Sequence, residues 1–218
     1  MRAIVAAIAY AFALASGAFA AEPEILFRDD FRGGLAAGWS WIREEPGAWR
    51  VTDQGLEVRI QPGNMWGKAN NAKNVLVRPI PDPAAQPIEV AVTVSNKPAC
   101  QYEQVDLVWY YDDAHMVKIG QEQVDNVLCL VMGREEGDKT KTLAKIPIDA
   151  LSLEVRFIAS GDTIRGQYRP TGTEGWKDAA ECLLPKRGEP KVSLQVYQGP
   201  KDAERWARFS GFRVVRAK

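Results

Sequence analysis

From residue 24 onward, short runs of apolar residues alternate with clusters of glycine, proline, aspartate or asparagine. Inside several runs every second residue is apolar, as where Leu153, Val155 and Phe157 enclose Glu154 and Arg156. Successive side chains of a strand point to opposite faces, so this spacing predicts strands with one face on a core and the other toward solvent. Few windows hold the 3.6-residue period of an amphipathic helix. The pattern therefore predicts an antiparallel all-β domain.

Twelve segments carry this strand signal in the sequence. They are residues 49–51, 56–60, 75–78, 88–94, 105–111, 116–121, 127–132, 142–146, 153–158, 163–168, 192–197 and 209–215. No linker rich in proline or serine divides them, and no repeat period is evident. We therefore expect one domain, a sandwich of two antiparallel sheets. One polar, asparagine-rich loop, residues 61–74 (QPGNMWGKANNAKN), carries Trp66 with no apolar neighbours that would bury it.

The segment 104–122, QVDLVWYYDDAHMVKIGQE, predicts two strands joined by a tight acidic turn. If residues 112–114 form the loop, Tyr110 pairs with Met116 and Val108 pairs with Lys118. Opposed residues share a face, so one face of this hairpin is apolar and the other carries four polar residues. These four residues are Asp106, Tyr110, Lys118 and Glu122. We expect them to lie together on an open face in contact with water.

The first twenty residues are typical of a secretory signal peptide. Arg2 precedes an apolar stretch over residues 3–15, and residues 18–20 form an A-x-A cleavage site. A membrane anchor is the disfavoured alternative, because the stretch is shorter than the ~20 residues that a spanning helix needs. We therefore expect cleavage after Ala20, a mature domain over residues 21–218, no membrane insertion after cleavage, and an extracytoplasmic location. The sequence leaves open whether the protein is periplasmic or secreted.

Charge and cysteine content narrow the classes of partner. The chain has 28 basic and 28 acidic residues, and loss of Arg2 with the signal peptide leaves a net charge of −1. No basic block is present, so nucleic acid and anionic membrane surfaces are disfavoured as partners. Three cysteines, Cys100, Cys129 and Cys182, allow at most one intramolecular disulfide, and their spacing selects neither a pair nor three free thiols. A zinc site is disfavoured, because no C-x-x-C motif is present and His115 is the only histidine.

Several short motifs follow one another in an order typical of a known group of domains. They are D-D-F at 29–31, G-W-S-W at 38–41, W-x-V-x-x-x-x-L at 49–56, Q-x-x-L-x-x-Y-x-D at 104–112, V-K-x-G-x-E at 117–122, a segment at 154–168, and F-x-x-F-x-V at 209–214. In them the chain resembles the concanavalin A-like jelly roll at the C-terminus of family 43 β-xylosidases and the bacterial family called domain of unknown function 1349. The resemblance implies a concanavalin A-like sandwich and contact with carbohydrate. The pattern of the group has glycine where this chain has Asp106.

Six residues form the candidate carbohydrate-contact set. They are Trp66, Arg78, Asp106, Tyr110, Lys118 and Glu122. An aromatic ring can stack on the C–H groups of a sugar, while charged and amide side chains bind its hydroxyls. The alternative is a solvated sheet face with a cross-strand ion pair of little energetic weight.

Catalysis and metal binding have weaker support in the sequence. Glycosidases use two carboxylates that flank one bond, and in a strand these would stand at even spacing. The two E-Q-V-D segments, at 103–106 and 122–125, place their acids three apart and so on opposite faces. A cross-strand pair, Asp106 with Glu122, is the catalytic alternative. The acidic pairs at 29–30 and 112–113 suit turn and capping roles better than a Ca²⁺ site, so we expect no cofactor.

We therefore expect an extracytoplasmic, non-catalytic module that binds a glycan or glycan-derived ligand. Two alternatives stay open from the sequence: a glycoside hydrolase with cross-strand carboxylates, and a protein-interaction or structural module. Neither the identity of the sugar nor the oligomeric state follows from the residues.

Overall fold

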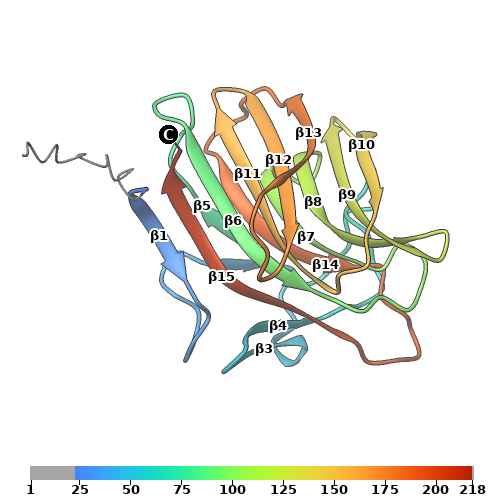
Figure 1. Ribbon diagram of the computed structural model, residues 1–218. Helices are drawn as coiled ribbons and strands as arrows, with labels where there is room; N and C mark the ends of the chain where they lie inside the picture. Colours follow the sequence, from blue (N-terminus) through green and yellow to red (C-terminus); the bar gives the residue numbers. More distant parts are fainter. Residues whose placement is uncertain (1–22, 218) are drawn as a thin grey trace, which may run out of the picture.

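A computed structural model describes residues 23–217 of the chain (Figure 1). The predicted signal peptide, residues 1–20, lies outside this part. The described chain folds into two antiparallel sheets that pack face to face, with one short 3-10 helix, η1 (Pro46–Ala48). The predicted all-β, two-sheet sandwich is confirmed. No helix within residues 23–217 is both long and apolar enough to cross a membrane.

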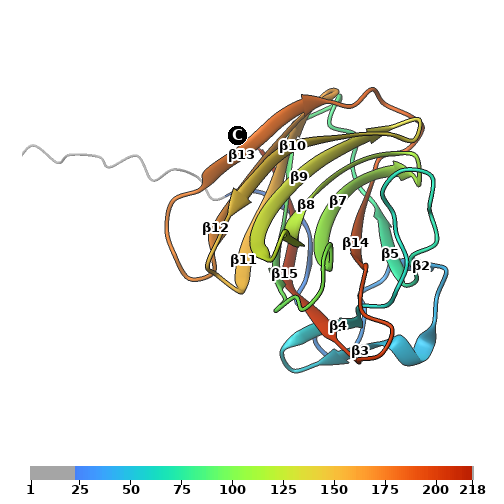
Figure 2. The same ribbon diagram turned by 90° about the vertical axis from the view of Figure 1, so that its right-hand side faces the viewer.

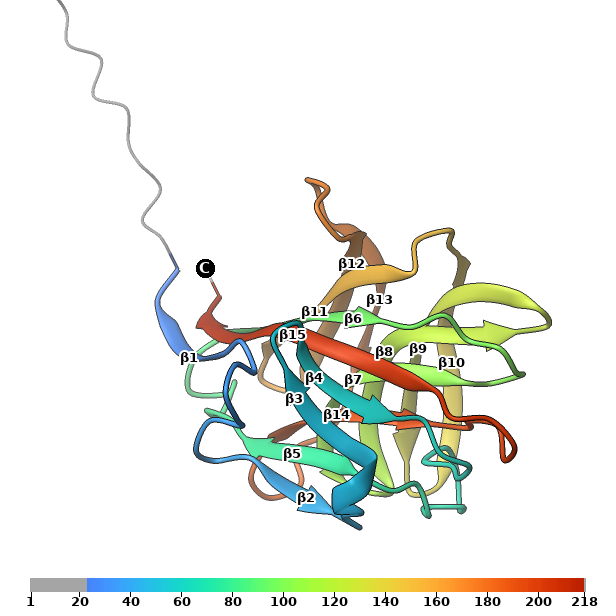
Figure 3. The same ribbon diagram turned by 90° about the horizontal axis from the view of Figure 1, so that it is seen from below.

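One sheet has eight strands in the order β13-β12-β11-β6-β15-β4-β3, and β1 adds to β15 (Figure 1). Its members are β1 (Ile25–Asp29), β3 (Trp49–Thr52), β4 (Gly55–Arg59), β6 (Ile88–Ser95), β11 (Ser152–Ser160), β12 (Thr163–Pro170), β13 (Lys177–Leu183) and β15 (Trp206–Arg216). The C-terminal end of β15 lies beside β1, the first described strand (Figure 3).

The other sheet has seven strands in the order β10-β9-β8-β7-β14-β5-β2, and Figure 2 shows its curvature. Its members are β2 (Ser40–Ile42), β5 (Val75–Pro79), β7 (Gln104–Asp112), β8 (His115–Val124), β9 (Val127–Glu136), β10 (Lys139–Pro147) and β14 (Lys191–Tyr197). The hairpin β7-β8 has the predicted register, with Tyr110 opposite Met116 and Val108 opposite Lys118. A bulge at Tyr111 lets Asp112 pair with His115, which shortens the turn relative to the prediction.

The main core lies between the two sheets and is built by the alternation that the sequence displays. Strand β11 buries every second residue, and its partner β6 does so over most of its length. The apolar face of the β7-β8 hairpin, including Leu107, Trp109 and Ile119, joins this core as predicted. Burial of this many apolar side chains supplies the main driving force for the fold.

A second apolar cluster lies on the outer face of the seven-stranded sheet. Its buried members are Met65, Ala72, Val75, Val77, Val108, Tyr110, Met116 and Tyr197. The loop of residues 61–74 supplies two of them and so covers part of this face. Strand β7 is consequently buried on both sides over residues 104–111, although its sequence reads as a strand with one wet face.

All twelve predicted strands are present, and three further strands were missed. The missed strands are β1, β2 and β13. Strand β2 has only three residues, and β13 has the sequence KDAAECL with four exposed positions and no regular alternation. Strands β2 and β13 lie at the ends of their sheets, and β1 pairs with β15 alone. A strand with one neighbour is less completely packed, so its alternation of apolar and polar residues is weaker.

Candidate functional site

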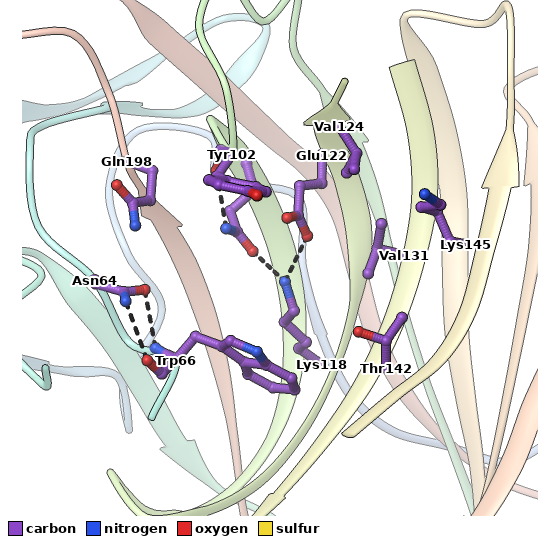
Figure 4. Close-up of a pocket in the computed structure, with 11 residues that line it drawn as sticks. Asn64, Trp66, Tyr102, Lys118, Glu122, Val124, Val131, Thr142, Lys145 and Gln198 are labelled. Carbon is purple, nitrogen blue, oxygen red and sulfur yellow. Dashed lines mark hydrogen bonds and ion pairs between the residues drawn. The ribbon is translucent and has the colours of Figure 1, made fainter. Parts of the chain in front are cut away.

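A pocket of about 580 Å³ opens on the outer face of the seven-stranded sheet, between the loop of residues 61–74 and strands β7 to β10 (Figure 4). The residues that line it are Asn64, Trp66, Tyr102, Gln104, Lys118, Glu122, Val124, Val131, Thr142, Lys145 and Gln198. Two aromatic rings, three primary amides, two hydroxyls, two ammonium groups and one carboxylate therefore line a single space.

A buried ion pair forms the floor of the pocket. The Lys118 ammonium donates to Glu122 Oε2 at 2.8 Å and to the side-chain oxygen of Gln104 (Figure 4). Gln104 lies opposite Glu122 in the β7-β8 ladder. Lys118 lies four residues before Glu122 on β8 and therefore on the same face. Lys118 is only 3% exposed. Burial lowers its pKa, but Asp106 and Glu122 more than offset this, so the pKa is raised and the ammonium stays charged.

Asp106 lies beneath this floor and is fully buried. Its cross-strand partner is Gly120, where a β-carbon would come within 2.5 Å of Asp106 Oδ1, so the carboxylate occupies the space that Gly120 leaves. Neither carboxylate oxygen makes a hydrogen bond of normal geometry to residues 23–217. Burial raises the pKa of Asp106 to about 7, with the Lys118 charge and the Tyr197 hydroxyl opposing the rise and Glu122 adding to it.

Two side chains hold the loop of residues 61–74 by hydrogen bonds: Asn64 within the loop, and the buried Glu135 of β9. Asn64 Oδ1 accepts from the Trp66 amide at 3.0 Å, and Asn64 Nδ2 donates to the Trp66 carbonyl at 3.0 Å (Figure 4). The next amide, of Gly67, donates to Glu135 Oε2 at 2.9 Å. Burial is the main cause that raises the pKa of Glu135 to about 7.

Arg43 ties the far end of the same loop to the turn of the β7-β8 hairpin. Its guanidinium donates to the Ala72 carbonyl at 2.7 Å and to both oxygens of Asp113, at 2.7 and 3.3 Å. Tyr110 also donates its hydroxyl to Asp113, at 2.7 Å. Planar, bidentate Arg–carboxylate contacts hold geometry well, so the loop has a defined position over the sheet.

The six-membered part of the Trp66 ring lies against Gly133 of β9, in the space that a side chain there would occupy. A β-carbon at Gly133 would come within 2.5 Å of the ring. The ring also lies 5.2 Å from the Lys118 ammonium, which is a cation–π distance, and Lys118 is the cross-strand partner of Gly133. The indole thus forms a wall of the pocket rather than part of the solvent-exposed loop surface.

The structure brings together three of the six predicted contact residues. Trp66, Lys118 and Glu122 line the pocket. Asp106 and Tyr110 share their sheet face, as predicted, but neither lines the pocket. The expectation that the polar face lies open to water is wrong, because the exposed fractions of Asp106, Tyr110, Lys118 and Glu122 are 0, 4, 3 and 8%.

Arg78 lies apart from the other five predicted residues. Its side chain points to the opposite face of the seven-stranded sheet, where the guanidinium carbon is 3.2 Å from the centre of the Phe27 ring and Nη1 donates to the Ala37 carbonyl at 2.5 Å. The predicted grouping of Arg78 with the pocket is therefore wrong. Leu76, two residues earlier on β5, lies in the main core. Because residues two apart in a strand share a face, the position of Leu76 predicts that Arg78 also points toward the core side.

Most of the remaining lining residues were missed in the sequence. Gln104 was missed although it shares a face with Asp106, and Tyr102, an exposed aromatic in a polar loop, has the same signal that singled out Trp66. Thr142, Lys145 and Gln198 come from β10 and from the segment after β14, and no local pattern marks them.

The acidic pairs near the termini of strands have protein partners. Asp29 accepts from the amides of Phe31 and Ala36 and from the indole of Trp39, at 2.7, 2.9 and 2.9 Å. Asp112 accepts from the Ala114 amide at 2.8 Å. Within residues 23–217 no group of three or more metal-ligating side chains is present. In the same part of the chain all three cysteines are free thiols.

No protein-family model and no curated protein matches this chain. Solved structures share its fold. A GH43 protein, BlXynB from Bacillus licheniformis, has a TM-score of 0.76 at 18% identity, with 87% of this chain and 39% of that chain covered. A xylan β-1,4-xylosidase from Bacillus halodurans C-125 has a TM-score of 0.75 at 18% identity, with 93% and 41% covered. The CBM2 module of Lactobacillus casei BL23 phage J-1 evolved Dit has a TM-score of 0.57 at 8% identity, with 89% of this chain and 97% of that module covered.

These similarities confirm the predicted resemblance to the β-sandwich of family 43 xylosidases at the level of the fold. The chain spans about two fifths of the length of the two Bacillus glycoside hydrolase chains. None of the comparisons tests the resemblance to domain of unknown function 1349.

Proposed function

We propose that this chain is an extracytoplasmic, non-catalytic module that binds a glycan in the pocket between the loop of residues 61–74 and strands β7 to β10. The observation that carries the proposal is the composition of this pocket. Trp66 and Tyr102 offer ring faces for the C–H groups of a sugar, and the amides, Thr142 and Glu122 offer groups for its hydroxyls. The β-sandwich neighbours from glycan-active proteins support the same class of ligand.

Binding is favoured over hydrolysis by the position of the carboxylates. A glycosidase needs two of them, both touching the substrate, on either side of one bond. Glu122 is the only carboxylate among the described residues that line the pocket. Asp106, its partner in the catalytic alternative, is fully buried beneath the Lys118–Glu122 pair and has no access to a bound sugar.

The experiment that tests the proposal is a binding screen of the mature chain against a broad panel of plant and bacterial polysaccharides, followed by titration of any ligand found. We expect Trp66→Ala and Tyr102→Ala each to weaken binding at least about tenfold, because each removes a stacking surface. Tyr102 is 48% exposed, so its substitution leaves the fold intact.

Trp176→Ala is the matched control for these variants. Trp176 is a half-buried tryptophan outside the pocket, in the loop before β13. Its ring centre lies 4.1 and 4.5 Å from the guanidinium carbons of Arg156 and Arg169 of the other sheet, and its loss is expected to leave affinity unchanged. Binding that survives both pocket variants, or no binding across the whole panel, would contradict the proposal. Release of reducing sugar that Glu122→Gln abolishes would contradict its non-catalytic part.

A further inference from the structure

Both ammonium groups that line the pocket already have carboxylate partners. Lys118 donates to Glu122 and Gln104, and it is enclosed between the rings of Trp66 and Tyr197, at 5.2 and 5.8 Å. Lys145 lies 3.8 Å from Asp125, with a half-exposed side chain. No arginine is among the pocket-lining residues of the described chain, so the pocket has no guanidinium group that could bind a carboxylate with two parallel hydrogen bonds.

The carboxylate of Glu122 has one oxygen left for a ligand. Its Oε2 atom accepts from Lys118, whereas Oε1 accepts from no group within residues 23–217. The Glu122 side chain is 10% exposed and borders the pocket, so this oxygen is in a site shielded from water. Asp106 lies below with a second negative charge whenever it is ionised. The floor therefore offers an acceptor and carries no excess positive charge.

We infer that the pocket selects uncharged sugars, and that Glu122 determines this specificity by accepting a hydroxyl hydrogen and repelling the carboxylate of uronic acids. This inference rests on the proposed function. A sugar hydroxyl can donate to Oε1, whereas a carboxylate at the same position brings two acceptors and two negative charges together. Like charges a few ångströms apart repel strongly where water is excluded, because screening there is weak.

The test uses matched oligosaccharides that differ in charge. Xylotetraose is compared with glucuronic acid-substituted xylotetraose, and the trimers of galactose and mannose with the trimers of galacturonic and mannuronic acid. Affinities are measured by calorimetry at pH 7.5 for the wild-type chain, Glu122→Gln and Glu174→Gln. Glu174 lies exposed in the loop between β12 and β13 and is the matched control.

We expect the wild-type chain to bind at least one neutral member at least about tenfold more tightly than its acidic counterpart. Glu122→Gln is expected to narrow this ratio by about tenfold, because the amide keeps an acceptor for Lys118 and loses the charge. Glu174→Gln is expected to retain the wild-type ratio.

Equal or tighter binding of the acidic member by the wild-type chain would overturn the inference while leaving the proposed function standing. An unchanged ratio in Glu122→Gln would also overturn it, since Glu122 would then not set the specificity. Absence of binding to every neutral and acidic member would instead contradict the proposed function, and with it the inference.

Discussion

At the scale of single residues, the buried carboxylate of Asp106 is the feature that most distinguishes this site. It lies at 0% exposure beside Gly120 and below the Lys118–Glu122 pair, and it lacks regular hydrogen-bond partners within the described chain. A buried acid in such a position favours its neutral form, because burial penalises the charge. The site thus contains a carboxyl group whose proton affinity is linked to folding.

This linkage gives a testable pH dependence of stability. Burial raises the pKa of Asp106 to about 7, so the folded protein holds a proton that the unfolded chain has lost between about pH 4 and 7. The contribution of the protonated Asp106 to the unfolding free energy is therefore full below about pH 4 and is lost as the pH rises through about 7. We expect the unfolding free energy to fall between pH 5 and 8, and Asp106→Asn to remove on the order of 2 kcal/mol of that fall.

Denaturant titrations of the wild-type chain and both variants at pH 5 and 8 check this expectation. Asp202→Asn, in the exposed loop after β14, is the matched control and should keep the wild-type pH profile. Burial also raises the pKa of Glu135 to about 7, so Glu135 likewise lowers the unfolding free energy as the pH rises. It accounts for the part of the decrease that persists in Asp106→Asn. A stability that rises from pH 5 to 8 at the same rate in all three chains would contradict the assignment.

The sequence allowed the face of each residue to be predicted but not its exposure. Alternation placed Asp106, Tyr110, Lys118 and Glu122 on one side of the hairpin, and the register is as predicted. Their burial depends on a loop some forty residues earlier in the chain, which no local pattern connects to this face. Long-range coverage of this kind is a property of the tertiary fold.

At the scale of elements, the loop of residues 61–74 turns a sheet face into a pocket. Arg43, Asn64 and Glu135 hold it by hydrogen bonds, and Met65 and Ala72 pack into the outer cluster. Loops held by a scaffold in this way commonly carry binding residues. Trp66 is consequently presented as a fixed wall whose position depends on Gly133 of β9.

The contact between Trp66 and Gly133 predicts a variant that alters the pocket without altering the fold. In Gly133→Ala the new methyl group would displace the Trp66 ring, which is the end of a side chain and can move. We expect glycan affinity to fall about tenfold while the melting temperature drops by only a few degrees. Calorimetric titration and thermal unfolding measure the two effects.

Gly47→Ala is the matched control for this variant, because a β-carbon at Gly47 meets no atom within 4 Å. It should leave both affinity and melting temperature near the wild-type values. Full affinity in Gly133→Ala would show that the Trp66 ring position is unimportant for binding.

At the scale of the whole molecule, two sheets of eight and seven strands form a sandwich whose general form was predictable. Regular alternation and turn residues identified twelve strands, and the ordered motifs indicated the concanavalin A-like resemblance. The weakly patterned strands β1, β2 and β13 became evident only from their pairing. Only three of the eleven pocket-lining residues, Trp66, Lys118 and Glu122, were predicted from local signals. Thr142, Lys145 and Gln198 reach the pocket through the tertiary fold.

The most direct test of the proposed glycan-binding pocket is an NMR titration that follows the indole N–H resonances of the tryptophans as oligosaccharide is added. We predict a saturable shift of the Trp66 indole, with the backbone amides of Tyr102, Glu122 and Gln198 moving at the same ligand concentrations. The Trp176 indole, which contacts Arg156 of the other sheet, is predicted to stay unchanged. Saturable shifts confined to Trp176 and its surroundings, with Trp66 unaffected, would contradict the account.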